Sequence, residues 1–354
     1  MSNPSFPRPT AGRLSLPLWQ ERYAAPLAPT TRAEMAARGW DAVDVVFVSG
    51  DAYVDHPSFA AAILHRSLER AGFRVAVLSQ PVWRNCEPWR EFGRPRLFYA
   101  VSAGNMDSMI NHYTANKKVR NDDAYSPGGR IGLRPDRATL VYCQRAREAY
   151  PGVPVIAGGV EASLRRLAHY DYWSDTVKRS IVLDSKADLV AYGMGEKSIV
   201  EIARRLAAGG TVKDLRDLRG VTYALGAKES TELASGSGLV GRVESARPDA
   251  AARVSVTGHD KSEPALDRAP DFRPNGPDAP RQVSKTRPDL QDPNQDLVFL
   301  PTYEQVRDDK LAFAEATRVI HTNTNPFNAV TLVQFHDRQA VVQTPPAEPL
   351  TQAE

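Results

Sequence analysis

Four short segments of the chain carry residues of the types that bind small molecules, and each segment follows a stretch predicted to be a strand. Their candidate ligand-binding residues are Gly50, Asp51, Asp55, His56, Ser102, Gly104, Asn105, Gly158, Gly159, Glu161, Ser163, Gly193, Gly195 and Glu196. Glycine lets a backbone approach a ligand closely, and free N–H groups at a helix start favour anionic groups. One Gly-Gly pair is more typical of a tight turn, but four such segments on one rim favour a site for a ligand or a partner.

Asp51, Asp55 and His56 could form an acid–base or metal-binding cluster. The alternative is a turn in which an aspartate caps the following helix and His56 hydrogen-bonds locally. No third ligand stands at helical spacing, so the sequence favours the turn. We therefore assign no metal site and no catalytic residue.

A second cluster combines cations with aromatic rings. It consists of Arg165, Arg166 and residues 169–173, which read His-Tyr-Asp-Tyr-Trp. Such residues can stack on a planar ligand. They also suit an amphipathic contact surface for a partner domain. The sequence leaves both interpretations open.

The elements that must position these segments follow from the hydrophobic pattern. Short apolar runs predict strands at residues 43–48, 73–78, 97–101, 153–157, 187–191, 221–225, 329–335 and 340–343. The strand at 221–225 is expected to close an edge. Helical patterns separate the first six strands, and short connections favour parallel pairing. The sequence therefore predicts an α/β fold with a doubly wound, mostly parallel sheet, whose ligands lie beyond the carboxyl ends of the strands.

Helix starts are marked by side chains that can accept a backbone N–H. Thr31 with Glu34, and Thr302 with Gln305, have the spacing of capping boxes. Asp136 is expected to cap a helix that runs on to the Pro-Gly pair after position 150.

The composition changes along the chain and predicts four regions. Residues 1–40 form a proline-rich N-terminal extension, and residues 41–225 form a Rossmann-like domain. Residues 226–296 are poor in aromatic residues and rich in Pro, Asp, Ser, Arg and Gly, so we expect a disordered insertion. Residues 297–354 are predicted to form a helical extension that links to further polypeptide.

Charge and apolar content argue against several classes of protein. The formal net charge of +3 is too small, and the arginines too scattered, to indicate nucleic-acid binding. No apolar run approaches the roughly 18 residues of a membrane span, so no membrane partner is expected. Cys86 and Cys143 match neither a disulfide framework nor a zinc or iron–sulfur spacing, which favours a reducing, cytoplasmic compartment.

Several strings of residues resemble the N-terminal half of YgiQ-type radical SAM proteins. The resemblance rests on residues 50–59, 102–111, 158–166 and 169–175, and it covers nearly the whole chain outside the insertion. It implies a flavodoxin-like, cobalamin-binding-like domain that precedes a radical SAM barrel. In that family a C-x-x-x-C-x-x-C loop of the barrel holds a 4Fe-4S cluster, which binds and cleaves S-adenosylmethionine.

The chain departs from this family pattern because it has no cysteine triplet. The resemblance thus implies the family without the activity, so that this chain is not catalytic by itself. The barrel is expected either in cis, lost from a truncated chain, or in trans on a second chain. The alternatives are a stand-alone module that binds cobalamin or a nucleotide as a small-molecule ligand, and a scaffold that docks another protein.

Histidine-ligated cobalamin is not expected, because the motif Asp-x-His-x-x-Gly is broken. Asp55 and His56 are adjacent, and no glycine stands three places later. The glycines at 158–159 and the segment 193–196 do match cobalamin-domain positions. A corrinoid without a histidine ligand is therefore the form that the resemblance leaves open.

Overall fold

Short strands alternate with helices over most of residues 26–236 and 297–351, which are the residues that the computed structural model describes. The strands are β1 (Val45–Ser49), β2 (Val75–Ser79), β3 (Phe98–Ser102), β4 (Val155–Gly158), β5 (His169–Asp171), β6 (Thr176–Lys178), β7 (Leu189–Ala191), β8 (Val221–Leu225), β9 (Leu297–Phe299), β10 (Thr331–His336) and β11 (Gln339–Gln343). The helices are α1 (Arg32–Ala37), α2 (Ala60–Arg70), α3 (Ser108–His112), α4 (Ala138–Ala149), α5 (Gly159–Leu164), α6 (Ile181–Ser185), α7 (Glu196–Ala207), α8 (Ala227–Gly236), α10 (Tyr303–Asp308) and α11 (Lys310–Thr322).

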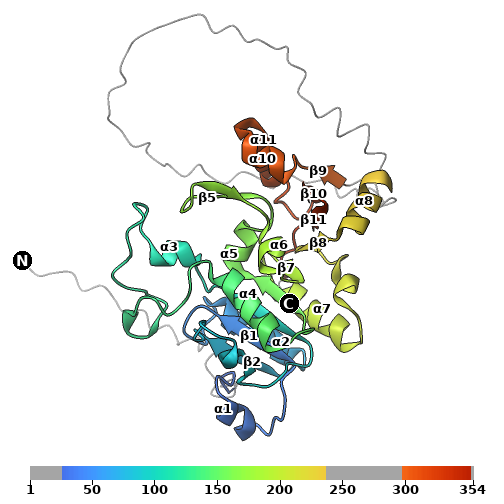
Figure 1. Ribbon diagram of the computed structural model, residues 1–354. Helices are drawn as coiled ribbons and strands as arrows, with labels where there is room; N and C mark the ends of the chain where they lie inside the picture. Colours follow the sequence, from blue (N-terminus) through green and yellow to red (C-terminus); the bar gives the residue numbers. More distant parts are fainter. Residues whose placement is uncertain (1–25, 237–296, 352–354) are drawn as a thin grey trace, which may run out of the picture.

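One 9-stranded sheet organises the molecule, in the order β2-β1-β3-β4-β7-β8-β11-β10-β9 (Figure 1). β1 pairs in parallel with β2 and β3, β3 with β4, and β4 with β7. From β7 through β8 and β11 to β10 the neighbours are antiparallel. The predicted α/β fold with a large, mostly parallel sheet is confirmed. The direction of winding reverses between β1 and β3, where α/β sheets commonly bind ligands.

Helices cover both faces of the parallel part of the sheet. Successive residues of a strand point to opposite faces, so each strand contributes side chains to two separate cores. Val46 and Val48 of β1 belong to the core under α4, together with Tyr142. Val45 and Phe47 belong to a second core, under α2 and α7. Burial on both faces explains why these strands are continuous apolar runs rather than alternating ones.

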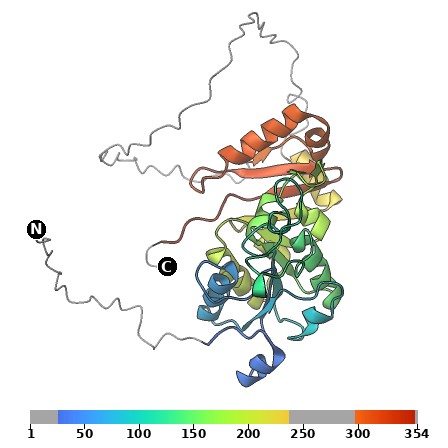
Figure 2. The same cartoon turned by 90° about the vertical axis from the view of Figure 1, so that its left-hand side faces the viewer.

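The C-terminal residues complete the sheet. The sequence places β8 at an edge, and this is wrong, because β8 lies between β7 and β11. Val342 of β11 lies opposite Tyr223 of β8. α10 and α11 pack together at the end of the sheet opposite β2 (Figures 1 and 2). Residues 297–343 thus contribute three strands to the main sheet as well as two helices. The sequence predicts two of these strands, at 329–335 and 340–343, but not that they join the main sheet.

Two of the three predicted helix caps are present. Thr31 and Thr302 form the predicted capping boxes. Asp136 does not cap α4, and that prediction is wrong: its carboxylate accepts a hydrogen bond from the hydroxyl of Tyr113 at 2.9 Å. Arg137 precedes α4 instead, at φ 51°, and makes no side-chain cap.

Two further segments bear on the predicted regions. Between β4 and β7 the chain forms an antiparallel hairpin, β5–β6, which the hydrophobic pattern does not predict. The predicted insertion begins with α8, while residues 237–296, like residues 1–25, lie outside the described residues, so its disorder stays a prediction. Across the described ranges, no helix combines the length and apolar character needed to cross a membrane.

Candidate functional site

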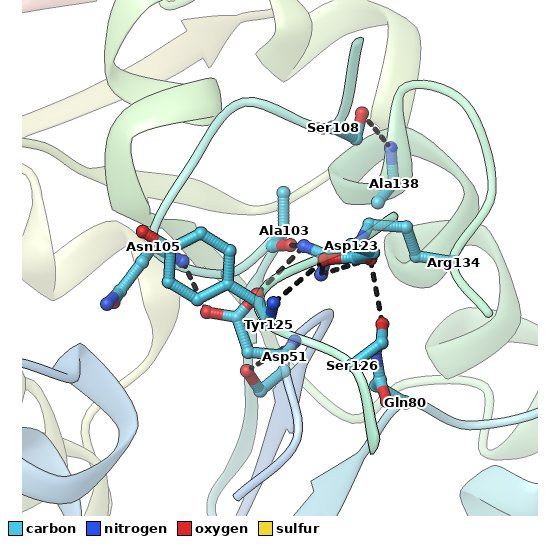
Figure 3. A network of polar contacts seen from close by, with 12 residues as sticks. Asp51, Gln80, Ala103, Asn105, Ser108, Asp123, Tyr125, Ser126, Arg134 and Ala138 are labelled. Carbon is cyan, nitrogen blue, oxygen red and sulfur yellow. Dashed lines mark hydrogen bonds and ion pairs between the residues drawn. The ribbon is translucent and has the colours of Figure 1, made fainter. Parts of the chain in front are cut away.

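A buried arginine joins the loops that follow β1 and β3 (Figure 3). Nη1 of Arg134 lies 2.8 Å from Oδ1 of Asp51 and 3.1 Å from the carbonyl oxygen of Ala103. Nη2 lies 3.0 Å from Oδ2 of Asp123. The backbone N–H of Asn105 donates to Asp51 at 2.7 Å. We call Asp51, Asp123 and Arg134 the buried ion cluster, since each is 3% exposed or less.

The two carboxylates of the buried ion cluster share one guanidinium, but their pKa values are shifted in opposite directions. Burial raises the pKa of Asp51 against the opposing effects of Asn105 and Arg134. Burial also disfavours ionisation of Asp123, but the side chains of Asn111 and Ser126, the Tyr125 N–H and Arg134 together lower its pKa. Desolvated ions cost several kcal/mol unless they are paired. The carboxylate of Asp51 is therefore fully used in contacts that hold together the loops after β1 and β3.

The glycines of these loops let the loops pack on one another. A Cβ on Gly104, which has φ +114°, would collide with the carboxylate of Asp51. A Cβ on Gly159, at φ +78°, would lie 2.5 Å from Oγ of Ser102. A Cβ on Gly50 would collide with a backbone oxygen of the loop after β3. At Gly50, Gly104 and Gly159 the group that lies close to the backbone belongs to the protein itself.

Asp55 and His56 lie apart from this network, on an exposed turn. Asp55 pairs with Arg66, and Nδ1 of His56 accepts the N–H of Ser58 at 3.1 Å. The N-cap residue of α2 is Phe59, which makes no side-chain cap. In the part of the chain that the structure describes, no three His, Cys, Asp or Glu side chains group as metal ligands. His56 therefore hydrogen-bonds locally, as the turn interpretation predicts, whereas Asp55 pairs with Arg66 and does not cap α2.

Glu161 and Ser102 bind backbone N–H groups. Glu161 is fully buried and accepts from Ser108 at 2.8 Å and from Thr139 at 2.9 Å. Oγ of Ser102 accepts the N–H of Gly104 at 3.1 Å. These bonds connect the starts of α3, α4 and α5. Both side chains therefore fix the rim of the sheet from within.

The loop after β7 is more open than the others. Gly193 has φ +75° and no atom within 4 Å of a built Cβ, whereas a Cβ on Gly195 would rest 3.6 Å from Leu64. Glu196 opens α7, and its Oε2 is buried with no hydrogen-bond partner among the described residues.

Gly158, at the end of β4, has an extended backbone at φ −162°.

The structure thus brings together residues 50–51, 102–105 and 158–161, whereas 55–56 and 193–196 lie outside this group. The hollow between β1 and β3, where the winding reverses, has a volume of about 10 Å³. That is room for about one water molecule. A ligand as large as a nucleotide or a corrinoid would have to lie on the outside of these loops.

A larger hollow opens beside the β5–β6 hairpin. We call it the aromatic cleft, and its lining includes Tyr113, Arg120, Arg165, Tyr172 and Trp173. Its volume is about 460 Å³, which is within the range of small-molecule sites, roughly 300–1,000 Å³. Part of the predicted cationic–aromatic cluster therefore surrounds a cavity.

Arg166 takes no part in the aromatic cleft. Its guanidinium stacks 4.6 Å from the centre of the Tyr192 ring and donates to Oε1 of Gln343 at 2.6 Å. The Arg166 guanidinium also donates to the backbone carbonyl of Ser163. Ser163, a candidate ligand-binding residue, therefore accepts a hydrogen bond from Arg166. Arg165 instead forms an ion pair with Asp107 at the base of the cleft. The two adjacent arginines serve different sites.

Several of these residues carry no clear signal in the sequence. Arg134 and Asp123 stand in a polar stretch that predicts only a long loop, and nothing local marks either as buried. Tyr113 and Arg120 are in the same stretch. The one available signal for them is that positions 112–120 contain two aromatic rings, His112 and Tyr113, followed by three basic residues, Lys117, Lys118 and Arg120.

The cysteines do not fit a 4Fe-4S cluster. Cys143 is fully buried within α4, and burial raises the pKa of its thiol to about 12. Cys86 is half-buried and packs against the same core. A radical SAM cluster needs three thiolates close in sequence, and the full sequence holds two cysteines.

The parallel strands, the helices on both faces and the polar loops at the carboxyl edge define a doubly wound α/β domain. The chain belongs to the radical SAM N-terminal family, whose family model matches residues 27–354. It is similar to the UPF0313 protein YgiQ of Escherichia coli, at 45% identity over 363 residues. A UPF0313 protein of Rhodopseudomonas palustris is 47% identical over 333 residues, or 94% of this chain. The resemblance to YgiQ-type proteins is confirmed.

The chain spans less than half of these relatives. It covers 47% of the Escherichia coli protein and 43% of the Rhodopseudomonas palustris protein. Among solved structures, the radical S-adenosylmethionine methyltransferase TsrM from Kitasatospora setae is similar, with 19% identity and a TM-score of 0.34. That likeness covers 51% of this chain and 28% of TsrM.

Proposed function

We propose that this chain is the N-terminal, non-catalytic part of a YgiQ-type radical SAM protein. The observation that carries the proposal is the combination of family membership with a cysteine content that cannot hold the cluster. The 4Fe-4S cluster and S-adenosylmethionine then belong to a barrel outside residues 1–354, in cis or in trans. The relatives, which are more than twice as long as the part matched here, have room for such a barrel.

We further infer that the parallel half is a flavodoxin-like, cobalamin-binding-like unit. The strand order β2-β1-β3-β4-β7 supports this, since it is the flavodoxin order when the small hairpin is left out of the count. The two free cysteines favour a reducing, cytoplasmic compartment. A histidine-ligated cobalamin is not part of the proposal, because Asp55 and His56 are adjacent and do not form the motif Asp-x-His-x-x-Gly.

Anaerobic reconstitution with iron and sulfide tests the proposal. The 354-residue chain and the full-length Escherichia coli YgiQ are treated in parallel, and bound iron, visible absorbance and S-adenosylmethionine cleavage are measured. We expect a stoichiometric cluster and cleavage from the longer protein, and neither from this chain.

The cysteine variants make this experiment decisive. If this chain bound a stoichiometric cluster that was lost on Cys86→Ser, the proposal would be wrong. Loosely bound iron that is unchanged in Cys86→Ser and Cys143→Ser agrees with it, because such iron does not depend on the thiols.

A further inference from the structure

The aromatic cleft is a cavity with rigid aromatic walls. The ring centres of Tyr113 and Trp173 are 5.4 Å apart, and those of Tyr172 and Trp173 are 5.3 Å apart. The hydroxyl of Tyr113 donates to Asp136 at 2.9 Å, and that of Tyr172 donates to the carbonyl of Ala115 at 2.7 Å. Hydroxyl hydrogen bonds therefore hold the two tyrosine rings in place, and the Trp173 ring packs against both. They can therefore stack on a ligand without first being ordered.

The carboxylates around the cleft are already paired within the protein. Asp107 pairs with Arg165. Asp171 is 4% exposed, binds Arg137 at 2.6 Å and accepts the N–H of Trp173 at 3.0 Å. No acidic side chain of the lining is therefore left to attract a cation.

The cations at the mouth are not neutralised in the same way. Nε of Arg120 donates to the carbonyl of Ile110 at 3.0 Å, and no ion pair to Arg120 occurs within the described ranges. Lys117 lies 4.9 Å above the Tyr172 ring and donates to the carbonyl of Trp173 at 3.3 Å. Arg120 and Lys117 are both exposed. The mouth of the cleft thus carries positive charge beside aromatic faces.

The lining also contains an uncharged hydrogen-bonding group. Burial lowers the pKa of His169 to about 4, so its imidazole is neutral at pH 7. Nδ1 lies 3.1 Å from the carbonyl oxygen of Leu167 and must donate to it, which leaves Nε2 as an acceptor. A ligand ring bearing an N–H group has a partner there.

We propose that the aromatic cleft binds a small molecule with a planar aromatic ring and an anionic group. The ligand ring packs against Tyr172 and Trp173, whose planes stand at 81° to each other, so that it stacks on one ring and meets the other with its edge. The anion is held by Arg120. A flat partner surface would not need a cavity of about 460 Å³ with its aromatic hydroxyls already bonded. The inference does not depend on where the iron–sulfur cluster lies, so the two proposals can fail separately.

Two probes share this chemistry and distinguish its sources: adenosine 5′-monophosphate, a nucleotide, and indole-3-acetate, an aromatic carboxylate. Isothermal titration calorimetry of the 354-residue chain measures each one, together with adenosine as the uncharged counterpart. We expect saturable binding of at least one anion at a 1:1 ratio. Arg120→Gln should weaken the anion roughly tenfold and leave adenosine unchanged.

Trp173→Ala and Tyr172→Ala should each weaken binding roughly tenfold, in line with the loss of one aromatic contact. Phe327→Ala is the matched control, since Phe327 is a 78% exposed aromatic away from the cleft. Arg204→Gln, an exposed arginine on α7, is the control for charge. Circular dichroism confirms that each variant is folded. Absence of saturable binding of either anion to the unaltered chain would overturn the proposal, as would binding that Trp173→Ala, Tyr172→Ala and Arg120→Gln all leave unchanged.

Discussion

Arg134 and Asp51 are 83 positions apart, yet their side chains meet at 2.8 Å in the interior of the protein. Asp51 follows β1, and Arg134 stands at the end of the long segment after β3, just before α4. The pair fixes two loops of the rim in one arrangement. The rim is therefore a pre-formed surface, and the buried cation Arg134 is one of the groups that hold its shape.

Replacing that cation should destabilise the whole fold. Arg134→Met leaves Asp51 and Asp123 buried without their guanidinium, and breaking a buried pair in this way costs about 3–5 kcal/mol. Urea denaturation followed by circular dichroism measures the free energy of unfolding. Arg204→Met, on the exposed face of α7, should change it by less than about 0.5 kcal/mol. Equal effects from the two substitutions would contradict the structural role of the buried ion cluster.

The stability lost when a loop glycine is replaced by alanine should depend on the atoms around that glycine. Gly104→Ala must both adopt φ +114° and displace the carboxylate of Asp51, so we expect a loss of more than about 2 kcal/mol. Gly128 has φ +65° and open space around it, so Gly128→Ala should cost about 1 kcal/mol from its backbone conformation alone. Thermal unfolding of both variants checks the order. A larger loss at Gly128 would be inconsistent with the packing between the loops.

Stability should fall as the pH drops from about 6.5 to about 4. Burial, together with smaller contributions from Arg179 and His169, lowers the pKa of His336 to about 4. The unfolded chain titrates near 6.5, so it binds protons before the native state does, and the native state loses stability over this interval. For His336 the loss amounts to about 3 kcal/mol at most. Both ring nitrogens of His336 are buried without a hydrogen-bond partner among the described residues.

His336→Phe isolates that contribution. The ring stacks on Tyr303 with centres 5.4 Å apart, and phenylalanine retains the stacking while removing the titratable group. At pH 7 the variant should be within about 1.5 kcal/mol of the unaltered chain. Melting curves between pH 4 and 7 should show a shallower dependence on pH, with the part due to His169 remaining. An unchanged slope would show that His336 does not titrate in this range.

The two thiols should differ in reactivity. Cys143 is fully buried with a pKa raised to about 12, so it presents almost no thiolate at pH 8. Cys86 is half-buried and reachable. Alkylation with a maleimide, followed by mass spectrometry, should label Cys86 first, and urea should make both residues reactive. Rapid labelling of Cys143 in the native protein would contradict its position inside α4.

The strands of the parallel half could be predicted because each is an apolar run with a turn signal at its end. β1 is buried at all five positions, which is the pattern of a strand covered on both faces. The capping boxes at Thr31 and Thr302 are local, and for that reason they were also predictable. These features depend on residues that are close in sequence.

The features that the sequence does not reveal depend on distant residues. β8 looks like an edge strand until β11, which comes after the insertion, is placed beside it. Asp136 looks like a helix cap because of its position, but Tyr113 and His112 compete for its carboxylate. The residues of the buried ion cluster are common polar types in loops, and only their convergence makes them structural. The hydrophobic periodicity of the sequence does not indicate that these three side chains meet.

The position of β11 has a consequence for synthesis on the ribosome. β1 to β8 can assemble as soon as they emerge, but β8 then presents unpaired backbone groups along one side until β11 has been made. A strand with such an unpaired edge can pair with a strand of a neighbouring nascent chain. Versions of the chain that end before Thr331 would keep this side uncovered permanently, so they should be prone to aggregate even though their parallel half is intact.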